Sequence, residues 1–144
     1  MISKRMLIVD DSANDVELTL LALEKFHFSN PVDVVRDGAE ALDYLFCRDA
    51  FAGREPGNPA VILLDIKMPK VDGLEVLRQI RGNPLLKMIP VVMLTSSKEQ
   101  RDIIEGYHLG VNAYVVKPVD FGQFTEAVRQ LGLFWLMLNE PPVH

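Results

Sequence analysis

Residues 62–69 read ILLDIKMP and place a carboxylate, Asp65, directly at the end of an apolar run that begins at Val61. A second apolar run, MLIV at residues 6–9, ends in the same way at Asp10 and Asp11. Both runs are continuously apolar rather than alternating, which is typical of strands buried on both faces of a parallel sheet. The two stretches therefore predict parallel strands that bring three acids to one edge of a sheet.

The rest of the chain alternates short β-branched runs with longer segments of helical periodicity, as expected where helices connect parallel strands. The predicted strands cover residues 6–9, 32–35, 61–64, 91–94 and 113–116. The first predicted helix follows Ser12. The other four cover residues 39–46, 74–81, 98–109 and 121 to about 138. This pattern predicts one α/β domain over residues 1–144, with a doubly wound five-stranded parallel sheet, five helices and a tail from about residue 139.

Local patterns predict how individual segments pack. The first helix starts with a capping signal, Ser12 followed by Asp15. Its apolar stripe consists of Val16, Leu20, Leu23 and Phe26. After the third helix, Leu85 and Leu86 are expected to turn back towards the core. The loop from Arg48 to Pro59 is rich in Gly, Pro and charge, which indicates a surface loop longer than usual.

Composition and charge are those of an ordinary globular protein, with 49% apolar residues, 24% charged residues and a net charge of −5. Lys and Arg are scattered, so no nucleic-acid partner is expected. The apolar runs are too short to cross a bilayer and the N-terminus carries no signal-peptide core, so we expect no membrane association and a cytoplasmic location. The single Cys47 forms no internal disulfide and is expected on the buried face of a helix.

Polar residues follow each of the five predicted strands, and only those after the second, Arg36-Asp37-Gly38, look like no more than a turn into a helix. Asp10 and Asp11 follow the first strand, Asp65 the third, Thr95 the fourth and Lys117 the fifth. Each of them alone has a structural explanation, such as a helix cap or a solvated lysine. However, ligands of open α/β sheets bind outside the carboxyl ends of the strands, near the switch in strand order. The set therefore indicates a functional site at this edge.

Three gathered carboxylates repel one another, so one of them must be protonated or a cation must be bound. Oxygen ligands without nearby His or Cys favour Mg²⁺, which commonly binds one or two carboxylates together with phosphate oxygens. A carboxylate beside Mg²⁺ can be the nucleophile that forms an aspartyl phosphate. Lys117 can balance the transferred charge, and the Thr95 hydroxyl can donate a hydrogen bond to a phosphoryl oxygen.

Four stretches resemble the receiver domain of two-component response regulators and occur in the family's order: LIVDDS at 7–12, VILLDIKMPKVDGLEVL at 61–77, PVVMLTSS at 90–97 and NAYVVKP at 112–118. The resemblance implies the flavodoxin-like fold with strand order 2-1-3-4-5. It also implies a stand-alone response regulator that accepts a phosphoryl group from a sensor histidine kinase and signals by altered protein contacts. Such a domain is not an enzyme with a separate substrate, although it contributes to its own Mg²⁺-dependent phosphorylation and dephosphorylation.

The same resemblance implies a role for each motif residue. Asp65 is the expected phosphoacceptor, and Thr95 and Tyr114 are the expected switch residues. The expected Mg²⁺ ligands are Asp10, Asp11, Asp65 and the backbone carbonyl of Lys67. Lys117 completes the reacting set, and the bond between Lys117 and Pro118 is expected to be cis.

The end of the chain suggests a subfamily and an assembly. Its sequence GLFWLMLNEPPVH, together with the long loop before the third strand, resembles stand-alone receivers that partner bacterial phytochrome histidine kinases. A kinase of this type is therefore one candidate partner. The last helix is apolar almost all round, which predicts a homodimer built on this helix and the tail, with Phe134, Trp135 and Leu136 in the interface.

Three alternatives remain beside a stand-alone regulator. One is an intermediate shuttle in a multistep phosphorelay. Another is a phosphatase of the haloacid-dehalogenase type, which needs a second Asp two residues after the nucleophile; Lys67 and Ser12 occupy those places here. The third is a pseudo-receiver that signals without phosphate, and the complete set of motif residues argues against it.

Overall fold

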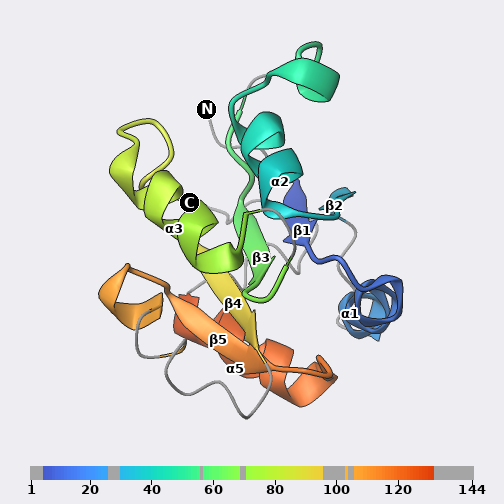
Figure 1. Ribbon diagram of the computed structural model, residues 1–144. Coiled ribbons are helices and arrows are strands. Elements are labelled where there is room, and N and C mark those ends of the chain that lie inside the picture. The colour runs from blue at the N-terminus through green and yellow to red at the C-terminus, as the bar shows by residue number, and fades with distance from the viewer. Residues whose placement is uncertain are drawn as a thin grey trace, which may run out of the picture.

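The structure is a computed structural model that describes residues 5–25, 30–55, 57–68, 71–95, 103 and 106–131. A five-stranded parallel sheet runs through its centre in the order β2-β1-β3-β4-β5 (Figure 1). The strands are β1 (Met6–Val9), β2 (Val32–Val35), β3 (Val61–Asp65), β4 (Val91–Thr95) and β5 (Ala113–Val116). The predicted fold class and strand order are confirmed.

Helices cover both faces of the sheet (Figure 1). They are α1 (Ala13–Lys25), α2 (Gly38–Leu45), α3 (Gly73–Gly82) and α5 (Phe121–Leu131), with a short 3₁₀ helix η1 (Asp49–Phe51) after α2. Most of the helix predicted over residues 98–109 lies outside the described residues. Within it, residues 103 and 106–108 are described and helical. The same holds for Phe26 and for the chain beyond residue 131, including the proposed interface residues Phe134, Trp135 and Leu136.

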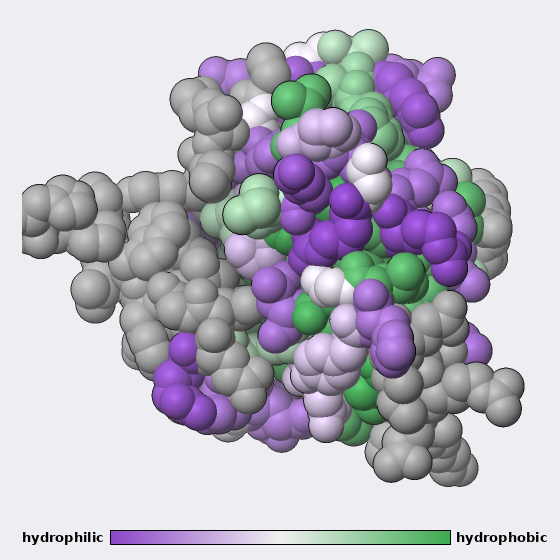
Figure 2. All heavy atoms as spheres, turned by 90° about the vertical axis from the view of Figure 1, so that its left-hand side faces the viewer, coloured by the Kyte–Doolittle hydropathy of each residue, from purple (hydrophilic) through white to green (hydrophobic). Residues whose placement is uncertain are grey.

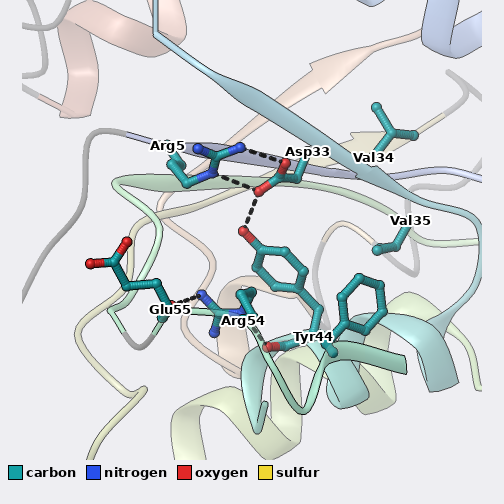
Figure 3. A pocket seen from close by; sticks show the side chains of 8 residues that line it. Arg5, Asp33, Val34, Val35, Tyr44, Arg54 and Glu55 are labelled. Atoms are coloured by element: carbon teal, nitrogen blue, oxygen red, sulfur yellow. Dashed lines mark hydrogen bonds and ion pairs between the residues drawn. The ribbon is translucent and has the colours of Figure 1, made fainter. Parts of the chain in front are cut away.

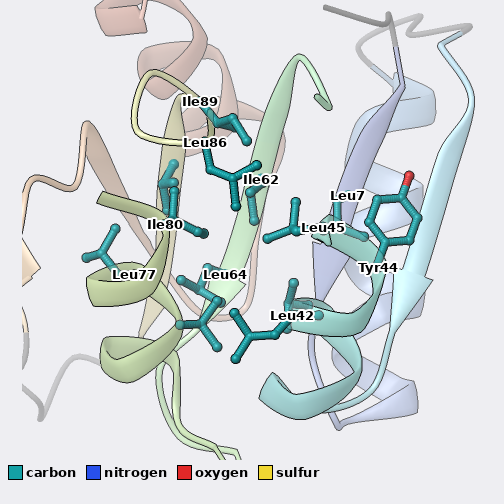
Figure 4. Close-up of a cluster of buried hydrophobic side chains, with 14 of the residues drawn as sticks. Leu7, Leu42, Tyr44, Leu45, Ile62, Leu64, Leu77, Ile80, Leu86 and Ile89 are labelled. Carbon is teal, nitrogen blue, oxygen red and sulfur yellow. The ribbon is translucent and has the colours of Figure 1, made fainter. Parts of the chain in front are cut away.

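Each central strand supplies side chains to two separate cores. In β1, Met6 and Ile8 join the cluster beneath α1 and α5, whereas Leu7 and Val9 join the cluster beneath α2 and α3. Figure 4 shows this second cluster between the sheet and the two helices. Because strand side chains alternate between the faces, burial on both sides requires an unbroken apolar run. This explains the continuous hydrophobicity seen in the sequence.

Aspartate caps fix where α2 and α3 begin. The Asp37 side chain accepts a hydrogen bond from the Glu40 N–H at 2.8 Å, and the Asp72 side chain accepts one from the Glu75 N–H at 3.0 Å. Such bonds satisfy backbone donors that have no partner within the helix. Ser12 caps α1 in the same way, since its hydroxyl accepts from the backbone N–H three residues later at 3.2 Å. The predicted capping signal is therefore confirmed.

Three predictions about packing are wrong. Leu20 is 39% exposed, and the buried stripe of α1 uses Thr19 instead, because the Thr19 hydroxyl is satisfied by the Asp15 carbonyl at 2.9 Å. Leu86 is buried but Leu85 is 82% exposed, since the turn after α3 directs only one of the two neighbours inwards. Cys47 lies in the turn after α2 with a φ of 52°, rather than on the buried face of a helix.

The long loop before β3 folds back onto α2 through Arg54 (Figure 3). The Arg54 Nε donates to the Tyr44 carbonyl at 2.9 Å, and the guanidinium lies 4.1 Å from the centre of the Tyr44 ring. The Tyr44 hydroxyl donates to Asp33 at 2.5 Å, and Arg5 donates to the same carboxylate from two nitrogens, at 2.8 and 2.9 Å. Arg54 thus joins the loop to α2, and Tyr44 joins α2 to β2.

The outer surface is mixed in character. Figure 2 views the side on which α3 lies, where hydrophilic side chains cover much of the centre and hydrophobic ones lie between them. Arg78 and Gln79 are among the exposed residues of α3. None of the helices in the described part of the chain has the length and apolar character needed to cross a membrane.

Candidate functional site

The strand register brings the predicted acids together. Val9 of β1 is paired with Leu64 of β3, so the residues that follow them, Asp10 and Asp65, lie side by side at the carboxyl edge of the sheet. Asp10 is fully buried and Asp65 is 5% exposed. Together with the exposed Asp11 they offer three carboxylate oxygens within 4.8 Å of one another. The structure thus brings together the three carboxylates predicted to gather here.

Backbone N–H groups hold one oxygen of each buried acid. The Ser12 N–H donates to Asp10 Oδ1 at 3.0 Å, and the Lys67 N–H donates to Asp65 Oδ1 at 3.3 Å. The second oxygen, Oδ2, of each carboxylate remains for other partners. Asp10 Oδ2 is buried and accepts no hydrogen bond of suitable geometry. Its contact is the ion pair with the Lys117 ammonium at 3.1 Å, and a carboxylate oxygen with further lone pairs suits an oxygen-binding cation.

Lys117 brings a positive charge to the same oxygens. Its Nζ lies 3.1 Å from Asp10 Oδ2 and 3.2 Å from Asp65 Oδ2. It also lies 3.0 Å from Asp15 Oδ2, on the first turn of α1. The backbone N–H of Lys117 donates to the carbonyl of Thr95 at 2.8 Å, and the bond from Lys117 to Pro118 is cis, as the family resemblance implies. One ammonium group is therefore shared by three carboxylates.

The electrostatics of the site reflect this excess of acid. Burial raises the pKa of Asp65, Lys117 lowers it and the charge of Asp10 raises it again, so that the pKa of Asp65 is about 7. Burial lowers the pKa of Lys117, but the hydrogen bond to Asp15 and the charges of Asp65 and Asp10 outweigh it and leave this pKa raised. An extra positive charge would relieve the remaining repulsion among the acids. The donor set and the charge both suit a divalent cation.

Two glycines allow α2 and α3 to approach the site closely. A Cβ on Gly73 would lie 2.2 Å from the backbone oxygen of Asp65, and a Cβ on Gly38 would lie 2.0 Å from the backbone oxygen of Val71. Only residues without a side chain fit at these places. Gly38 and Gly73 were not among the predicted site residues. An Asp-Gly pair at both helix starts, with Asp as the cap, is the signal that could have revealed them.

The predicted switch residues lie on neighbouring strands. Thr95 is buried at 1% exposure and is paired in register with Val116 of β5. Tyr114, on the same strand, is 42% exposed and points away from the core. Its ring packs edge to face against Tyr107, with ring centres 6.0 Å apart and planes at 85°. A pocket beside this pair is lined by Gln123 and Ala127 of α5, among others.

Asp15 is the site residue that the sequence interpretation missed. It was assigned only to a helix-capping signal, yet its carboxylate is one of three acceptors for Lys117. The available signal was its position, one helical turn after the Asp10-Asp11 pair, on the helix that starts at the carboxyl edge. Of Lys67, the structure shows the N–H bound to Asp65, whereas a role for its carbonyl as a metal ligand stays a prediction.

Comparison with known proteins agrees with this geometry. Residues 6–129 match the family described as the response regulator receiver domain. The bacteriophytochrome response regulator RtBRR is 61% identical, with a TM-score of 0.88, over 99% of this chain and 85% of that one. The bacteriophytochrome response regulator AtBRR is 56% identical, with a TM-score of 0.86, over 95% of this chain and 98% of that one.

A third similar protein is response regulator Rcp1 of Synechocystis sp., which is 37% identical over 92% of this chain and 89% of its own length. The crystal structure of its Mn²⁺-bound form covers 98% of this chain and 100% of that one, with 36% identity and a TM-score of 0.77. The family match spans most of the chain and includes every strand and the acidic edge. The chain belongs to the response regulator receiver domain family.

Proposed function

We propose that Asp65 accepts a phosphoryl group from a phosphohistidine of a sensor histidine kinase, and that the protein then acts through altered contacts with other proteins. The observation that carries this proposal is the placement of Asp65 Oδ2. It lies beside two further acids and 3.2 Å from the Lys117 ammonium, at the edge where α/β sheets bind ligands. A carboxylate so placed can act as a nucleophile towards phosphorus.

The metal in this proposal is Mg²⁺, bound by Asp10, Asp11, Asp65 and the carbonyl of Lys67. The clustered carboxylates support it, as does the Mn²⁺ in the similar protein Rcp1. When bound, the cation supplies positive charge that favours the ionised carboxylate and the phosphoryl oxygens. The chain's own residues orient Asp65 through the Lys67 N–H and place the Lys117 charge beside the reacting oxygen.

The proposed signal passes from Thr95 to Tyr114. A phosphoryl group on Asp65 offers new acceptor oxygens to the Thr95 hydroxyl, because Asp65 and Thr95 end adjacent strands. An inward movement of Thr95 makes room for the exposed Tyr114 ring, which would leave Tyr107. The surface formed by β5 and α5 then changes, and a partner distinguishes the two states.

The proposed partner is a sensor histidine kinase of the bacterial phytochrome type, because RtBRR and AtBRR are named as bacteriophytochrome response regulators. The proposed assembly is a homodimer through the last helix and the tail, supported by the apolar sequence there. The proposed location is the cytoplasm. A role as a shuttle in a longer phosphorelay uses the same chemistry and differs only in the next acceptor.

The test is phosphorylation by a small phosphodonor such as acetyl phosphate with Mg²⁺, followed by intact-mass measurement. Wild-type protein is expected to gain one phosphoryl group, and Asp65→Asn is expected to gain none. Asp43→Asn is the matched control, because Asp43 lies on α2 with Arg48 as its ionic partner and should leave phosphorylation intact. Labelling of Asp65→Asn, or steady multiple turnover of simple phosphate esters, would contradict the proposal.

The assembly has a separate test. Sedimentation of the full chain at micromolar concentration is expected to show a dimer, and Trp135→Glu is expected to shift it towards monomer. A wild-type monomer in both phosphorylation states would rule out the dimer without affecting the phosphoacceptor proposal.

A further inference from the structure

Asp15 belongs to the reacting site through its contact with Lys117. An ammonium group has three N–H donors, and Lys117 Nζ has three carboxylate oxygens at 3.0 to 3.2 Å, one each from Asp10, Asp15 and Asp65. Two of these acids belong to the cluster that can hold a metal ion. Asp15 does not belong to that cluster, so it is the one acceptor of Lys117 among the three that a bound cation would leave untouched.

Lys117 and a bound cation would both interact with the carboxylates of Asp10 and Asp65. The Oδ1 atoms of Asp10 and Asp65 already accept backbone N–H groups, so their Oδ2 atoms are the ones that face Lys117. A cation held by Asp10, Asp11 and Asp65 would share these carboxylates with Lys117 and would repel its ammonium group. If Lys117 had no other acceptor, the metal ion and Lys117 would compete for the same carboxylates. Stronger binding of one would then weaken the binding of the other.

We infer that Asp15 is a positioning residue that holds Lys117 in the site while a divalent cation occupies Asp10, Asp11 and Asp65. This inference rests on the proposed function and adds a residue to it. The location of Asp15 suits the role. Its backbone N–H is fixed by the Ser12 hydroxyl at the start of α1, and its side chain, 30% exposed, reaches Lys117 from outside the buried acid pair.

The test is a metal titration by calorimetry with Mg²⁺ alone. Asp15→Asn keeps the size of the side chain but weakens its hold on Lys117, which then binds Asp10 and Asp65 more firmly. We expect the dissociation constant for Mg²⁺ to rise about fivefold, the scale of a partly exposed charge pair. Asp15→Glu is expected to restore most of the affinity, and Glu17→Gln, which removes an exposed charge from the same helix, is expected to change it less than twofold.

A double-mutant cycle separates positioning from simple attraction between Asp15 and the metal. In a Lys117→Met background there is no ammonium to hold, so Asp15→Asn is expected to change Mg²⁺ affinity less than twofold. An equal loss in both backgrounds would overturn the inference, because Asp15 would then act on the cation directly. An unchanged affinity of the single variant Asp15→Asn would overturn it as well.

Phosphorylation kinetics provide a second readout. With acetyl phosphate as donor, Asp15→Asn is expected to need about fivefold more Mg²⁺ for half-maximal rate. The rate at saturating Mg²⁺ is expected to fall as well, because Lys117 is then held less firmly beside Asp65. A fall in the saturating rate without any change in the Mg²⁺ requirement would overturn the positioning role. Failure of wild-type protein to bind Mg²⁺ would instead refute the proposed function, so the two failures are distinguishable.

Discussion

Two half-buried cations at opposite edges of the sheet have opposite kinds of partner. At the carboxyl edge, Lys117 is surrounded by charged carboxylates. Near the amino ends of β4 and β5, Arg81 of α3 is bound by neutral oxygens. Its Nε donates to the Gly110 carbonyl at 2.8 Å, and its terminal nitrogens donate to Lys87, Ile89 and Asn112 at 2.8 to 3.0 Å.

The difference separates a structural cluster from a reactive one. Each nitrogen of Arg81 has an oxygen partner, and the accepting Asn112 side chain also binds the Val91 N–H at 2.8 Å. Burial lowers the pKa of Arg81, and no carboxylate among the described residues pairs with it. Around Lys117 a single ammonium group faces three carboxylates, so the charges do not balance. Satisfied polar groups stabilise a fold, whereas unbalanced ones are poised to bind a ligand.

The largest expected effect comes from adding a side chain at Gly73, which lies against the backbone of Asp65. Gly73→Ala puts a methyl group 2.2 Å from the Asp65 backbone oxygen, so α3 or the end of β3 must move. We expect a loss of about 3 kcal/mol in unfolding free energy and slower phosphorylation, because Asp65, the proposed nucleophile, is displaced. Denaturant unfolding and acetyl phosphate kinetics measure the two effects.

Gly82→Ala is the matched control for this change. It lies in the same helix, and a Cβ there meets nothing within 4 Å. Its stability is expected to stay within about 1 kcal/mol of wild type, with unchanged phosphorylation. Equal effects of the two substitutions would show that helix propensity, rather than contact with Asp65, is responsible.

Breaking the Arg81 cluster is expected to affect stability alone. Arg81→Met removes the donors of four oxygen atoms and should cost about 2 kcal/mol in unfolding free energy, with Mg²⁺ affinity unchanged within about twofold. Arg78→Met is the control, because the ion pair of Arg78 with Glu75 is exposed and should contribute less than about 0.5 kcal/mol. A large loss of metal binding in Arg81→Met would show that the two clusters are coupled.

Removing the charge of Asp65 from the carboxyl edge is expected to stabilise the metal-free protein, by a smaller amount than the changes above. Because the pKa of Asp65 is raised to about 7, the folded state favours its protonated form. The associated stability is fully present below the ordinary aspartate pKa of about 4 and is lost as pH rises through about 7. Asp65→Asn lacks this loss, so at pH 8 it should be more stable than wild type by about 1 to 2 kcal/mol.

This difference is measured by denaturant unfolding of chelator-treated protein between about pH 4 and pH 8. The interval runs from the ordinary aspartate pKa to just above the pKa of Asp65. The two proteins should converge at the acid end. Added Mg²⁺ should narrow the gap at the alkaline end, because it binds the folded wild type. A wild type that is more stable than Asp65→Asn at pH 8 without metal would contradict the assignment of unbalanced charge to this edge.

Much of the fold followed from local patterns. Continuous apolar runs predicted buried parallel strands, and each predicted strand was found within one residue at its ends. The acids at the ends of two such runs predicted the site, because the carboxyl ends of parallel strands share an edge. What failed depended on how helices and turns rotate against the sheet, as Leu20 and Leu85 show.

The sequence by itself determined the strand pattern, the acidic edge and the residues Asp10, Asp65, Thr95 and Lys117, because chain order and alternation assign each to the end of a strand. Only the tertiary structure brought Asp15 onto Lys117 across a separation of 102 residues and pressed Gly73 against the backbone of Asp65. The physical reason is that such contacts depend on the docking of helices on the sheet. Docking is set by the packing of whole faces, which no short stretch of sequence encodes.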